Sequence, residues 1–257
     1  MKYVRFSQDD TVMFGLIDND GVIKRLKNNF LEGVQEEGNE YYKIENVDLL
    51  PPVERPSQII AIGLNYAGHA AESKKDIPKE AMMFMVSPSA VLGDQCTIKI
   101  PFLEHRVDYE AELAVVIGKE ASQVKKADAL DYIFGYTCAN DISDRTLQKN
   151  DGQFTRAKSY ATFKPIGPVI ETEISPNNLS IKLRLNGELM QNSNTNDLIH
   201  DIESLIEQVT QVMTLYPGDI ILTGTPQGVG PIAPGDEVSV EIEGIGILSN
   251  YVQAVGY

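Results

Sequence analysis

The most constraining feature of the sequence is an acidic stretch that runs without a break into an apolar one. The stretch DYEAE at 108–112 is followed directly by LAVVI at 113–117. Because side chains alternate between the two faces of a strand, we expect Glu110 and Glu112 on one face and the apolar residues 113, 115 and 117 on the other. At about 4 Å and an effective dielectric constant of about 20, two like charges repel by roughly 4 kcal/mol. This pair therefore needs a cation or a shared proton.

A third acid, Asp141, follows the apolar run FGYTCAN at 134–140, which is typical of a strand. Ends of strands that lead into loops often carry functional groups. Together with Glu110 and Glu112 it would make an all-oxygen site, which selects Mg²⁺ or Mn²⁺ and leaves positions for water and an oxygen-rich substrate. The alternative is that the two glutamates only form the solvated face of an edge strand, and their spacing alone favours this simpler interpretation.

A second candidate site lies in the run GLNYAGHAAE at 63–72. If Asn65 caps a helix here, His69 and Glu72 lie three residues apart on one face, where the carboxylate can orient and polarise the imidazole. Such a pair is a competent general base. The alternative is a histidine beside a glutamate on the surface, and the residues alone favour it because charged i,i+3 pairs are common on helices.

The loop LTGTPQGVGP at 222–231 is rich in glycine but does not fit a nucleotide site. It lacks the G-K-[ST] of a P-loop, and Pro231 has no backbone N–H where a helix would have to begin. Glycines around a threonine can still let backbone N–H groups and a hydroxyl approach a small carboxylate. The sequence also contains no zinc-binding motif and no G-x-S-x-G element, which excludes the common zinc and serine hydrolases.

A proline-rich connector divides the chain. Residues 3–17 and 21–26 are predicted to form short strands, and the three prolines at 51–56 exclude a helix or a central strand there. We therefore expect a small N-terminal β domain at 1–50 and a catalytic domain at 57–257.

The second part is predicted to be rich in strands. Asn186-Gly187 is the strongest short turn signal in the chain and predicts a hairpin. Apolar residues recur at three- and four-residue steps between Asp197 and Leu215, which predicts one amphipathic helix. The fold class is therefore expected to be mainly β, of the α+β type.

The charge balance excludes some classes of partner. The 257 residues include 22 Lys and Arg against 37 Asp and Glu, a formal net charge of −15. Nucleic acids and anionic membranes attract basic surfaces, so neither is expected as a partner. The sequence has no apolar stretch near the roughly 18 residues of a spanning helix and no signal-peptide pattern. We expect a cytoplasmic protein.

Five motifs in one order resemble those of the fumarylacetoacetate hydrolase family. They are GLNYAGHAAE at 63–72, DYEAELAVVIGK at 108–119, GYTCANDISDRTLQ at 135–148, AKSYATFKPIGP at 157–168 and LTGTPQGVGP at 222–231. The resemblance covers about residues 58 to 257 and leaves out only the N-terminal module. It implies a mixed β-roll core with a small N-terminal β domain, assembled as a homodimer.

The resemblance assigns roles to residues and reverses both simpler interpretations. It implies that Glu110, Glu112 and Asp141 bind Mg²⁺ or Mn²⁺, and that three carboxylates, the ion and Lys158 would together be neutral. The acid/base residues that it implies are His69 and Glu72, with Lys158 beside the metal ligands. The substrate contacts that it implies are Tyr66, Arg145, Gln148 and Thr225. One stretch departs from the family, because FMVSP stands at 84–88 where many relatives have a lysine.

The resemblance implies a small 2-oxo acid as substrate. A divalent ion would draw charge from its carbonyl group and stabilise the enolate that C–C cleavage, decarboxylation and proton transfer all generate. We expect an enzyme that hydrolyses the C–C bond of acylpyruvates, decarboxylates oxaloacetate, or does both. The alternatives are an isomerase or decarboxylase of aromatic meta-cleavage products such as 2-hydroxyhepta-2,4-diene-1,7-dioate, and a non-catalytic metal-dependent binding protein on the same scaffold.

The charged segment SKKDIPKEAM at 73–82 directly follows His69 and Glu72 in the chain. Its composition suggests a lid that orders on substrate binding and carries His69 inward. The alternative is an inert surface loop, because most polar connections are no more than that.

Overall fold

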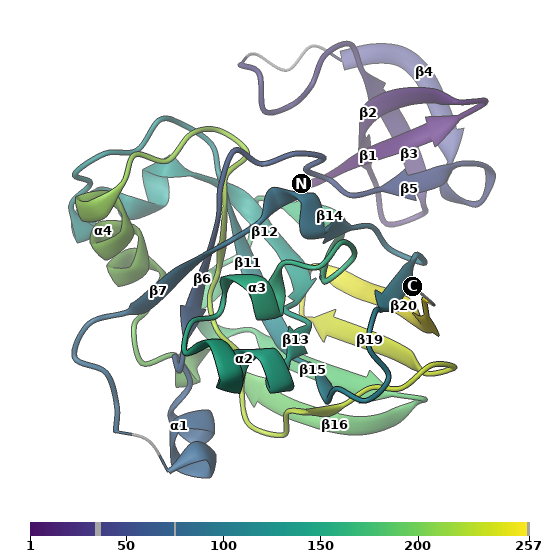
Figure 1. The fold of residues 1–257 in the computed structure, drawn as a ribbon. Coiled ribbons are helices and arrows are strands. Elements are labelled where there is room, and N and C mark those ends of the chain that lie inside the picture. The colour runs from purple at the N-terminus through teal and green to yellow at the C-terminus, as the bar shows by residue number, and fades with distance from the viewer. Residues whose placement is uncertain (34–36, 75, 256–257) are drawn as a thin grey trace.

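Twelve strands of the described chain, residues 1–33, 37–74 and 76–255, pair into one sheet in the computed structural model (Figure 1). These strands are β1 (Lys2–Gln8), β2 (Thr11–Ile17), β3 (Val22–Leu26), β4 (Glu37–Lys43), β5 (Asp48–Leu50), β6 (Ile59–Gly63), β7 (Met82–Val86), β8 (Val91–Leu92), β11 (Ala111–Ile117), β12 (Ile133–Asn140), β14 (Lys164–Glu171) and β17 (Ile220–Leu222). Their order in space is β4-β3-β2-β1-β14-β12-β11-β17-β6-β7, with β5 on β1 and β8 on β14. The sheet therefore runs from the N-terminal module into the core.

Two smaller sheets complete the core. One has the order β16-β15-β19-β20-β9 and contains β9 (Thr97–Ile100), β15 (Ser180–Leu185), β16 (Glu188–Asn194), β19 (Glu237–Ile242) and β20 (Gly246–Ala254). The other has the order β13-β10-β18 and contains β10 (Val107–Tyr109), β13 (Ser143–Asp144) and β18 (Gly230–Pro231). This content of strands confirms the predicted mainly β fold class.

The helices of the described residues are short and lie around the sheets (Figure 1). The α-helices are α1 (Ala67–Ser73), α2 (Arg145–Asp151), α3 (Thr155–Lys158) and α4 (Ile202–Val212), and the 3-10 turns are η1 (Ile44–Asn46), η2 (Pro88–Ala90), η3 (Lys126–Tyr132), η4 (Pro176–Asn178) and η5 (Thr195–Asp197). Within the described ranges, no helix has the length and apolar character needed to cross a membrane.

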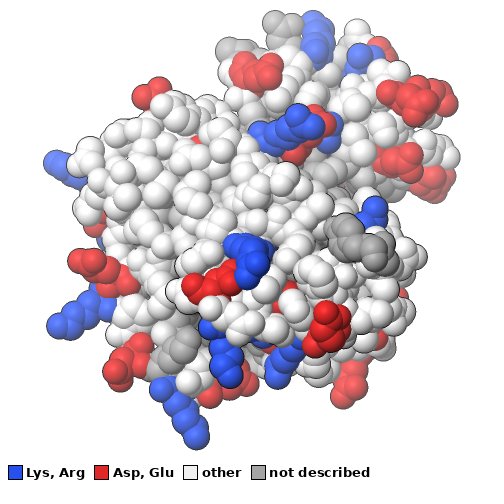
Figure 2. Space-filling model, in the orientation of Figure 1, with Lys and Arg blue, Asp and Glu red and all other residues white. Residues whose placement is uncertain are grey.

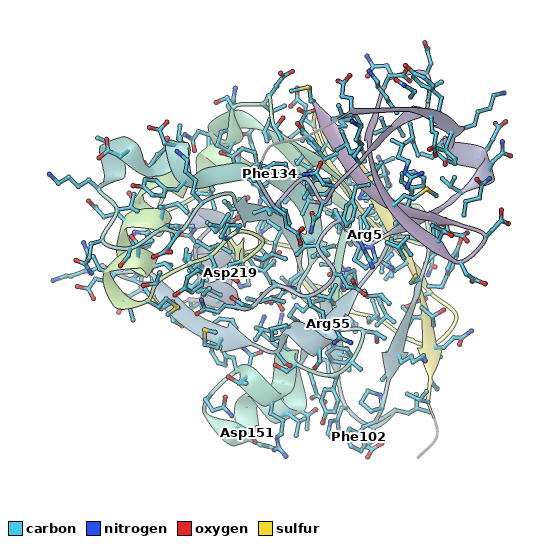
Figure 3. The ribbon with its side chains drawn as sticks, turned by 90° about the horizontal axis from the view of Figure 1, so that it is seen from above. Arg5, Arg55, Phe102, Phe134, Asp151 and Asp219 are labelled. Carbon is cyan, nitrogen blue, oxygen red and sulfur yellow. The ribbon has the colours of Figure 1, made fainter. Side chains whose placement is uncertain are left out.

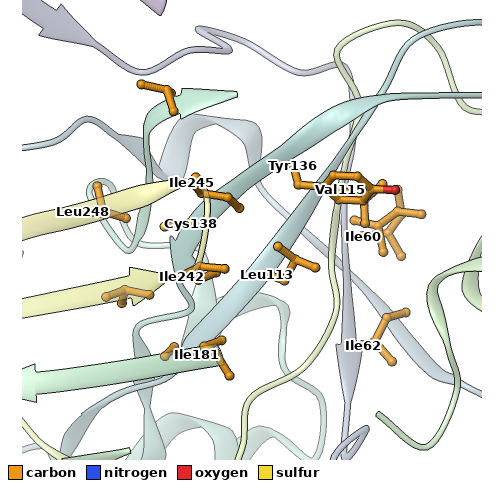
Figure 4. Packing of buried hydrophobic residues seen from close by; sticks show 14 of the residues in the cluster. Ile60, Ile62, Leu113, Val115, Tyr136, Cys138, Ile181, Ile242, Ile245 and Leu248 are labelled. Atoms are coloured by element: carbon orange, nitrogen blue, oxygen red, sulfur yellow. The ribbon is translucent and has the colours of Figure 1, made fainter. Parts of the chain in front are cut away.

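Strand β11 lies at the centre of the large sheet. It pairs with β12 on one side and with β17 on the other, and all seven of its residues are buried. Leu113 and Val115 pack on one face with Ile181 and Ile242 of the smaller sheet (Figure 4). The intervening Ala114 and Val116 pack into a second apolar cluster on the opposite face. The continuous apolar run thus reflects burial on both faces, and the edge-strand interpretation of the two glutamates is wrong.

The N-terminal module is joined to the core by pairing and by aromatic packing. Strand β1 pairs antiparallel with β14, where Tyr3 lies opposite Ile170. Tyr3 also contacts Phe30 and Phe134, and these two rings stack with centroids 5.4 Å apart. Phe134 belongs to β12 of the core and is labelled in Figure 3. The sheet is therefore continuous across the connector, and the division into domains at 1–50 and 57–257 stays a prediction.

Several local predictions can be compared with the structure. The hairpin is confirmed, because Asn186 and Gly187 adopt φ values of 52° and 82° between β15 and β16. The helix α4 is shorter than predicted, since the side chain of Asp201 accepts a hydrogen bond from Ser204 N and caps the helix there. The segment 73–82 leads from the end of α1 to the start of β7, and residue 75 lies outside the described residues.

The proline-rich connector is held to the core by one buried carboxylate. Asp219, which is labelled in Figure 3, is fully buried and accepts hydrogen bonds from Ser57 Oγ at 2.6 Å, Gln58 N at 2.9 Å and Tyr216 N at 2.8 Å. These bonds connect the chain before β6 to the turn before β17. These hydrogen bonds therefore hold the start of β6 beside the start of β17, where the two strands pair.

Replacement of Asp219 tests this role. Asp219→Ala should lower the free energy of unfolding by about 3 kcal/mol, since each buried donor left without an acceptor costs about 1–3 kcal/mol. Asp219→Asn should cost less, because its amide oxygen can still accept the bonds from Ser57 and Gln58. Urea denaturation of the two variants measures the difference. Equal destabilisation by both would argue against these hydrogen bonds as the cause.

Candidate functional site

A cavity of about 520 Å³ opens where β6 and β12 end and β11 begins, near α2 and the glycine-rich loop. One part of its wall is charged and the other is apolar. The charged and polar lining residues include Arg106, Asp108, Glu110, Glu112, Asp141, Arg145, Gln148, Lys149, Lys158 and Thr225. The apolar lining residues include Ile62, Leu64, Met82, Phe84, Phe154 and Val229. The cavity thus offers polar contacts at one end and a hydrophobic surface at the other.

The three predicted acids meet at the charged end. Glu110, Glu112 and Asp141 are 5%, 2% and 1% exposed, and each offers a carboxylate oxygen within 4.8 Å of the others. Backbone pairing brings them together, because Asp141 N donates to Glu110 O at 2.8 Å and Glu110 N donates to the side chain of Asn140 at 2.9 Å. Oxygen donors of this kind fit Mg²⁺ or Mn²⁺.

Two cations stabilise Glu110 in its ionised form. Lys158 Nζ donates to Glu110 Oε2 at 2.7 Å and to Asp141 Oδ2 at 2.5 Å, and Arg145 donates to the other oxygen of Glu110. Burial alone would raise the pKa of Glu110, but the charges of Arg145 and Lys158 hold it below its usual range. Burial likewise opposes the charge of Lys158, yet Asp141 and Glu110 raise the pKa of its ammonium group.

Glu112 has a different environment. Among the described residues it makes no ion pair, and its carboxylate accepts one hydrogen bond, from Gly224 N at 2.8 Å. Burial, Asp141 and Glu110 together raise its pKa well above the usual range. Negative charge is therefore least compensated on the Glu112 side of the three acids. This is the place where a divalent cation would relieve repulsion.

A second buried lysine, which the sequence analysis did not identify, faces the site from behind. Lys164 is 1% exposed, and its Nζ lies 2.6 Å from Asp141 Oδ1. Burial lowers the pKa of Lys164 to about 8 in spite of the opposing charge of Asp141. The predicted charge balance is thus incomplete, since Lys164 and Arg145 add two positive charges to it. The motif AKSYATFKPIGP contains Lys164, but nothing in its spacing showed that the side chain points inward.

Two arginines share another buried acid at the cavity wall. Asp108 accepts hydrogen bonds from Arg106 Nε and Arg145 Nε, each at 2.8 Å. Arg145 also donates to Gln148 Oε1 at 2.7 Å. The side chains of Arg145 and Gln148 start from α2, which begins at Arg145 because the Asp144 side chain accepts a hydrogen bond from the N–H of Leu147 in its first turn. Arg145 and Gln148, three residues apart, therefore both line the cavity, and the substrate contacts that the resemblance implies for them stay a prediction.

Asn65 does not cap α1, which corrects the sequence prediction. Tyr66 occupies the cap position, and the Asn65 side chain instead donates to Thr223 O at 2.8 Å and accepts from His200 N at 2.8 Å. It thereby holds the glycine-rich loop. Gly224 adopts a φ of 97°, and a Cβ there would lie 2.9 Å from Asn65. The backbone N–H of this loop does approach a carboxylate, but it is that of Glu112.

The other predicted residues lie at different depths. His69 lines the cavity, and its Nδ1 is 3.4 Å from Glu72 Oε2, so the predicted pair is present on α1. Glu72 is half exposed and is not a lining residue. Thr225 lines the cavity and is held through its hydroxyl by Gln191 at 2.9 Å. Tyr66 is fully buried and is absent from the lining, so the structure does not bring it to the cavity.

Comparison with known proteins places the chain among enzymes of one family. Residues 58–253 match the family described as Fumarylacetoacetate (FAA) hydrolase C-terminal, and residues 1–52 match the family described as Rv2993c-like, N-terminal. An uncharacterised protein of Methanocaldococcus jannaschii is 53% identical, over 77% of this chain and 84% of its own length. Oxaloacetate tautomerase FAHD2B of Bos taurus, a mitochondrial protein, is 45% identical, over 80% of this chain and 69% of its own length.

Solved structures show the same fold. The 5-carboxymethyl-2-hydroxymuconate delta-isomerase from Mycobacterium smegmatis is 40% identical and superposes with a TM-score of 0.92, over 99% of this chain and 100% of the other. The maleylpyruvate hydrolase from Sphingobium sp. SYK-6, in complex with manganese(II) and pyruvate, is 31% identical with a TM-score of 0.82, over 99% of each chain. The relatives thus include isomerases and hydrolases.

Opposite effects on stability are expected from neutralising the two glutamates. In the metal-free protein, Glu112→Gln should raise the free energy of unfolding by about 1–3 kcal/mol, because it removes repulsion from Asp141 and Glu110. Glu110→Gln should lower it by about 3 kcal/mol, because Lys158 and Arg145 lose their partner charge.

The pH dependence provides a further check. A carboxyl group with a raised folded pKa costs stability as the pH rises through the range between its unfolded and folded pKa values. The advantage of Glu112→Gln should therefore grow with pH from about 4.3 upward. Urea unfolding in EDTA at several pH values measures both variants. Destabilisation by Glu112→Gln at neutral pH would contradict the assignment of charge.

Proposed function

The chain belongs to the fumarylacetoacetate hydrolase family, and on this basis we propose that it is a divalent-metal-dependent enzyme that interconverts the keto and enol forms of oxaloacetate. The reaction moves a proton between C3 and the oxygen at C2. Mg²⁺ or Mn²⁺ would be held by Glu110, Glu112 and Asp141. When bound, such an ion would draw electron density from the 2-oxo group and lower the energy of the enolate.

The observation that carries this proposal is the charge of the cavity wall. Four carboxylates, those of Asp108, Glu110, Glu112 and Asp141, face an equal number of cations. The cations that line the cavity are Arg106, Arg145, Lys149 and Lys158. With all of these groups ionised the wall is neutral, so a divalent metal ion would leave it two charges positive. A dicarboxylate with two negative charges, such as oxaloacetate, would restore neutrality.

The positions of the side chains support the roles that we propose for them. Arg145 and Gln148 lie side by side at the cavity and can bind the C1 carboxylate, since a guanidinium group pairs well with that shape. The Nδ1 of His69 faces Glu72, which leaves Nε2 to exchange a proton with C3 of the substrate. As the C3–H bond breaks, its proton passes to the imidazole, its electron pair forms the C2–C3 double bond, and the carbonyl pair moves to oxygen, which then takes up a proton to complete the enol.

Proton transfer is favoured here over the cleavage reactions expected from the sequence. Three relatives that are 43–45% identical to this chain have names that state a reaction, and each is an oxaloacetate tautomerase. The maleylpyruvate hydrolase in complex with manganese is less similar, at 31% identity. Acylpyruvate hydrolysis and oxaloacetate decarboxylation would pass through the same enolate, so they are measured in the same experiment. The isomerase in the comparison also carries a name that implies a proton shift.

We also propose a homodimer. Figure 2 shows a broad area without charged side chains between α4 and the N-terminal module. Exposed apolar residues of the core include Met85 of β7 and Tyr216, which are 40% and 47% exposed. A large uncharged surface of this kind suits contact with a second copy. Sedimentation velocity would distinguish a dimer from a monomer.

The proposed reaction can be measured directly. With Mg²⁺ or Mn²⁺, the protein should accelerate the ketonisation of enol-oxaloacetate, followed by the loss of enol absorbance, and EDTA should abolish this effect. His69→Gln should lower kcat by about 10²–10⁴ because it removes the general base. Glu72→Gln should lower it less, since Glu72 only orients the imidazole. Metal binding should be unchanged in both variants.

The competing reactions are followed in parallel by pyruvate release from oxaloacetate and from acetylpyruvate. Faster pyruvate release from either compound than ketonisation would replace the proposal with decarboxylation or hydrolysis. If His69→Gln keeps full ketonisation activity, the assigned proton transfer is wrong.

A further inference from the structure

Lys164 is a buried cation that the proposed reaction does not use. It is the first residue of β14 and is 1% exposed. Its Nζ has three oxygen atoms within 3.0 Å, namely Asp141 Oδ1 at 2.6 Å, Phe163 O at 2.8 Å and Ile142 O at 3.0 Å. Lys164 is also absent from the residues that line the cavity. It therefore has no route to the substrate.

Asp141 is held between two lysines. Its Oδ2 is 2.5 Å from Lys158, and its Oδ1 is 2.6 Å from Lys164. The two lysines differ in freedom, because Lys158 borders the cavity, whereas Lys164 is enclosed and bonded to two backbone carbonyls. An incoming cation could displace Lys158 toward the cavity, whereas the burial of Lys164 and its bonds to Phe163 O and Ile142 O hold it in place. Lys164 is thus a fixed positive charge behind one of the three acids.

A fixed charge here has two opposing consequences. It stabilises Asp141 as a buried anion when no metal is present, since an unpaired buried charge is costly. It also repels any divalent cation that binds to Asp141, because like charges at short range interact strongly inside a protein. The same ammonium group therefore stabilises the metal-free site and lowers the affinity of that site for a divalent cation.

We propose that Lys164 is a positioning residue that keeps the metal-free site folded and lowers the affinity of that site for divalent ions, so that the ion exchanges readily. The inference rests on the metal site of the proposed function. It concerns binding and stability and does not depend on which reaction the enzyme catalyses.

The test removes the charge and keeps the size of the side chain. Lys164→Met should tighten Mn²⁺ binding at least tenfold in isothermal titration calorimetry. It should also lower the unfolding temperature in EDTA and enlarge the increase that Mn²⁺ produces. Tighter binding is a readout that a damaged site would not give, because loss of supporting contacts weakens metal binding. The matched control is Lys125→Met, because Lys125 is exposed and does not line the cavity. This variant should leave both the Mn²⁺ affinity and the unfolding temperature unchanged.

The outcomes separate this inference from the proposed function. If the wild-type protein binds no Mn²⁺, both fail. If it binds Mn²⁺ and Lys164→Met binds with equal or lower affinity, only the role of Lys164 is overturned. Where Lys164→Met does not fold in EDTA, Lys164→Gln, which can still donate to the carbonyls, takes its place. Folding of these variants only with Mn²⁺ would support the inference, and failure to fold even with Mn²⁺ would overturn it.

Discussion

Three carboxylates are buried at the end of one sheet, and the unfavourable energy of that burial explains much of what surrounds them. Each acid is 5% exposed or less, so water cannot offset the repulsion among them. The structure offsets it with two lysines, an arginine and the backbone N–H of Gly224. Of the three acids, Glu112 alone has no cation beside it among the residues that the structure describes. The placement of charge, more than the shape of the cavity, is therefore the feature that makes these three acids suited to a divalent cation.

Sheet register makes this concentration of charge possible. Antiparallel pairing puts Ala111 opposite Asn140, so Glu110 and Asp141 lie together where β11 and β12 meet. The neighbouring apolar residues of β11 pack into clusters on both faces and fix the strand. The glycine-rich loop follows β17 on the other side of β11 and is held there by Asn65. Strand β11 thus positions both β12 and the strand from which the glycine-rich loop leads.

Short-range patterns in the sequence predicted some of these features and not others. The period of two placed Glu110 and Glu112 on one face, and the Asn186-Gly187 turn was sufficient to predict its hairpin. The position of Lys164 could not be predicted this way, because its burial depends on contacts with Asp141, 23 positions earlier. The role of Asn65 could not be predicted for a similar reason. Asparagine is a residue type that often caps helices, but the hydrogen-bond partners of Asn65, Thr223 and His200, lie far away in the chain.

The continuity of the large sheet has a consequence for evolution and for engineering. Because β1 pairs with β14, the N-terminal module covers one edge of a core strand. A core cut at the proline connector would present that edge to solvent, with unpaired N–H and C=O groups that invite pairing with other chains. The N-terminal module therefore shields this edge of β14 from pairing with other chains. Gene fusions or truncations that replace it would leave the edge of β14 at Ile170 and Glu171 unpaired unless they supplied another strand.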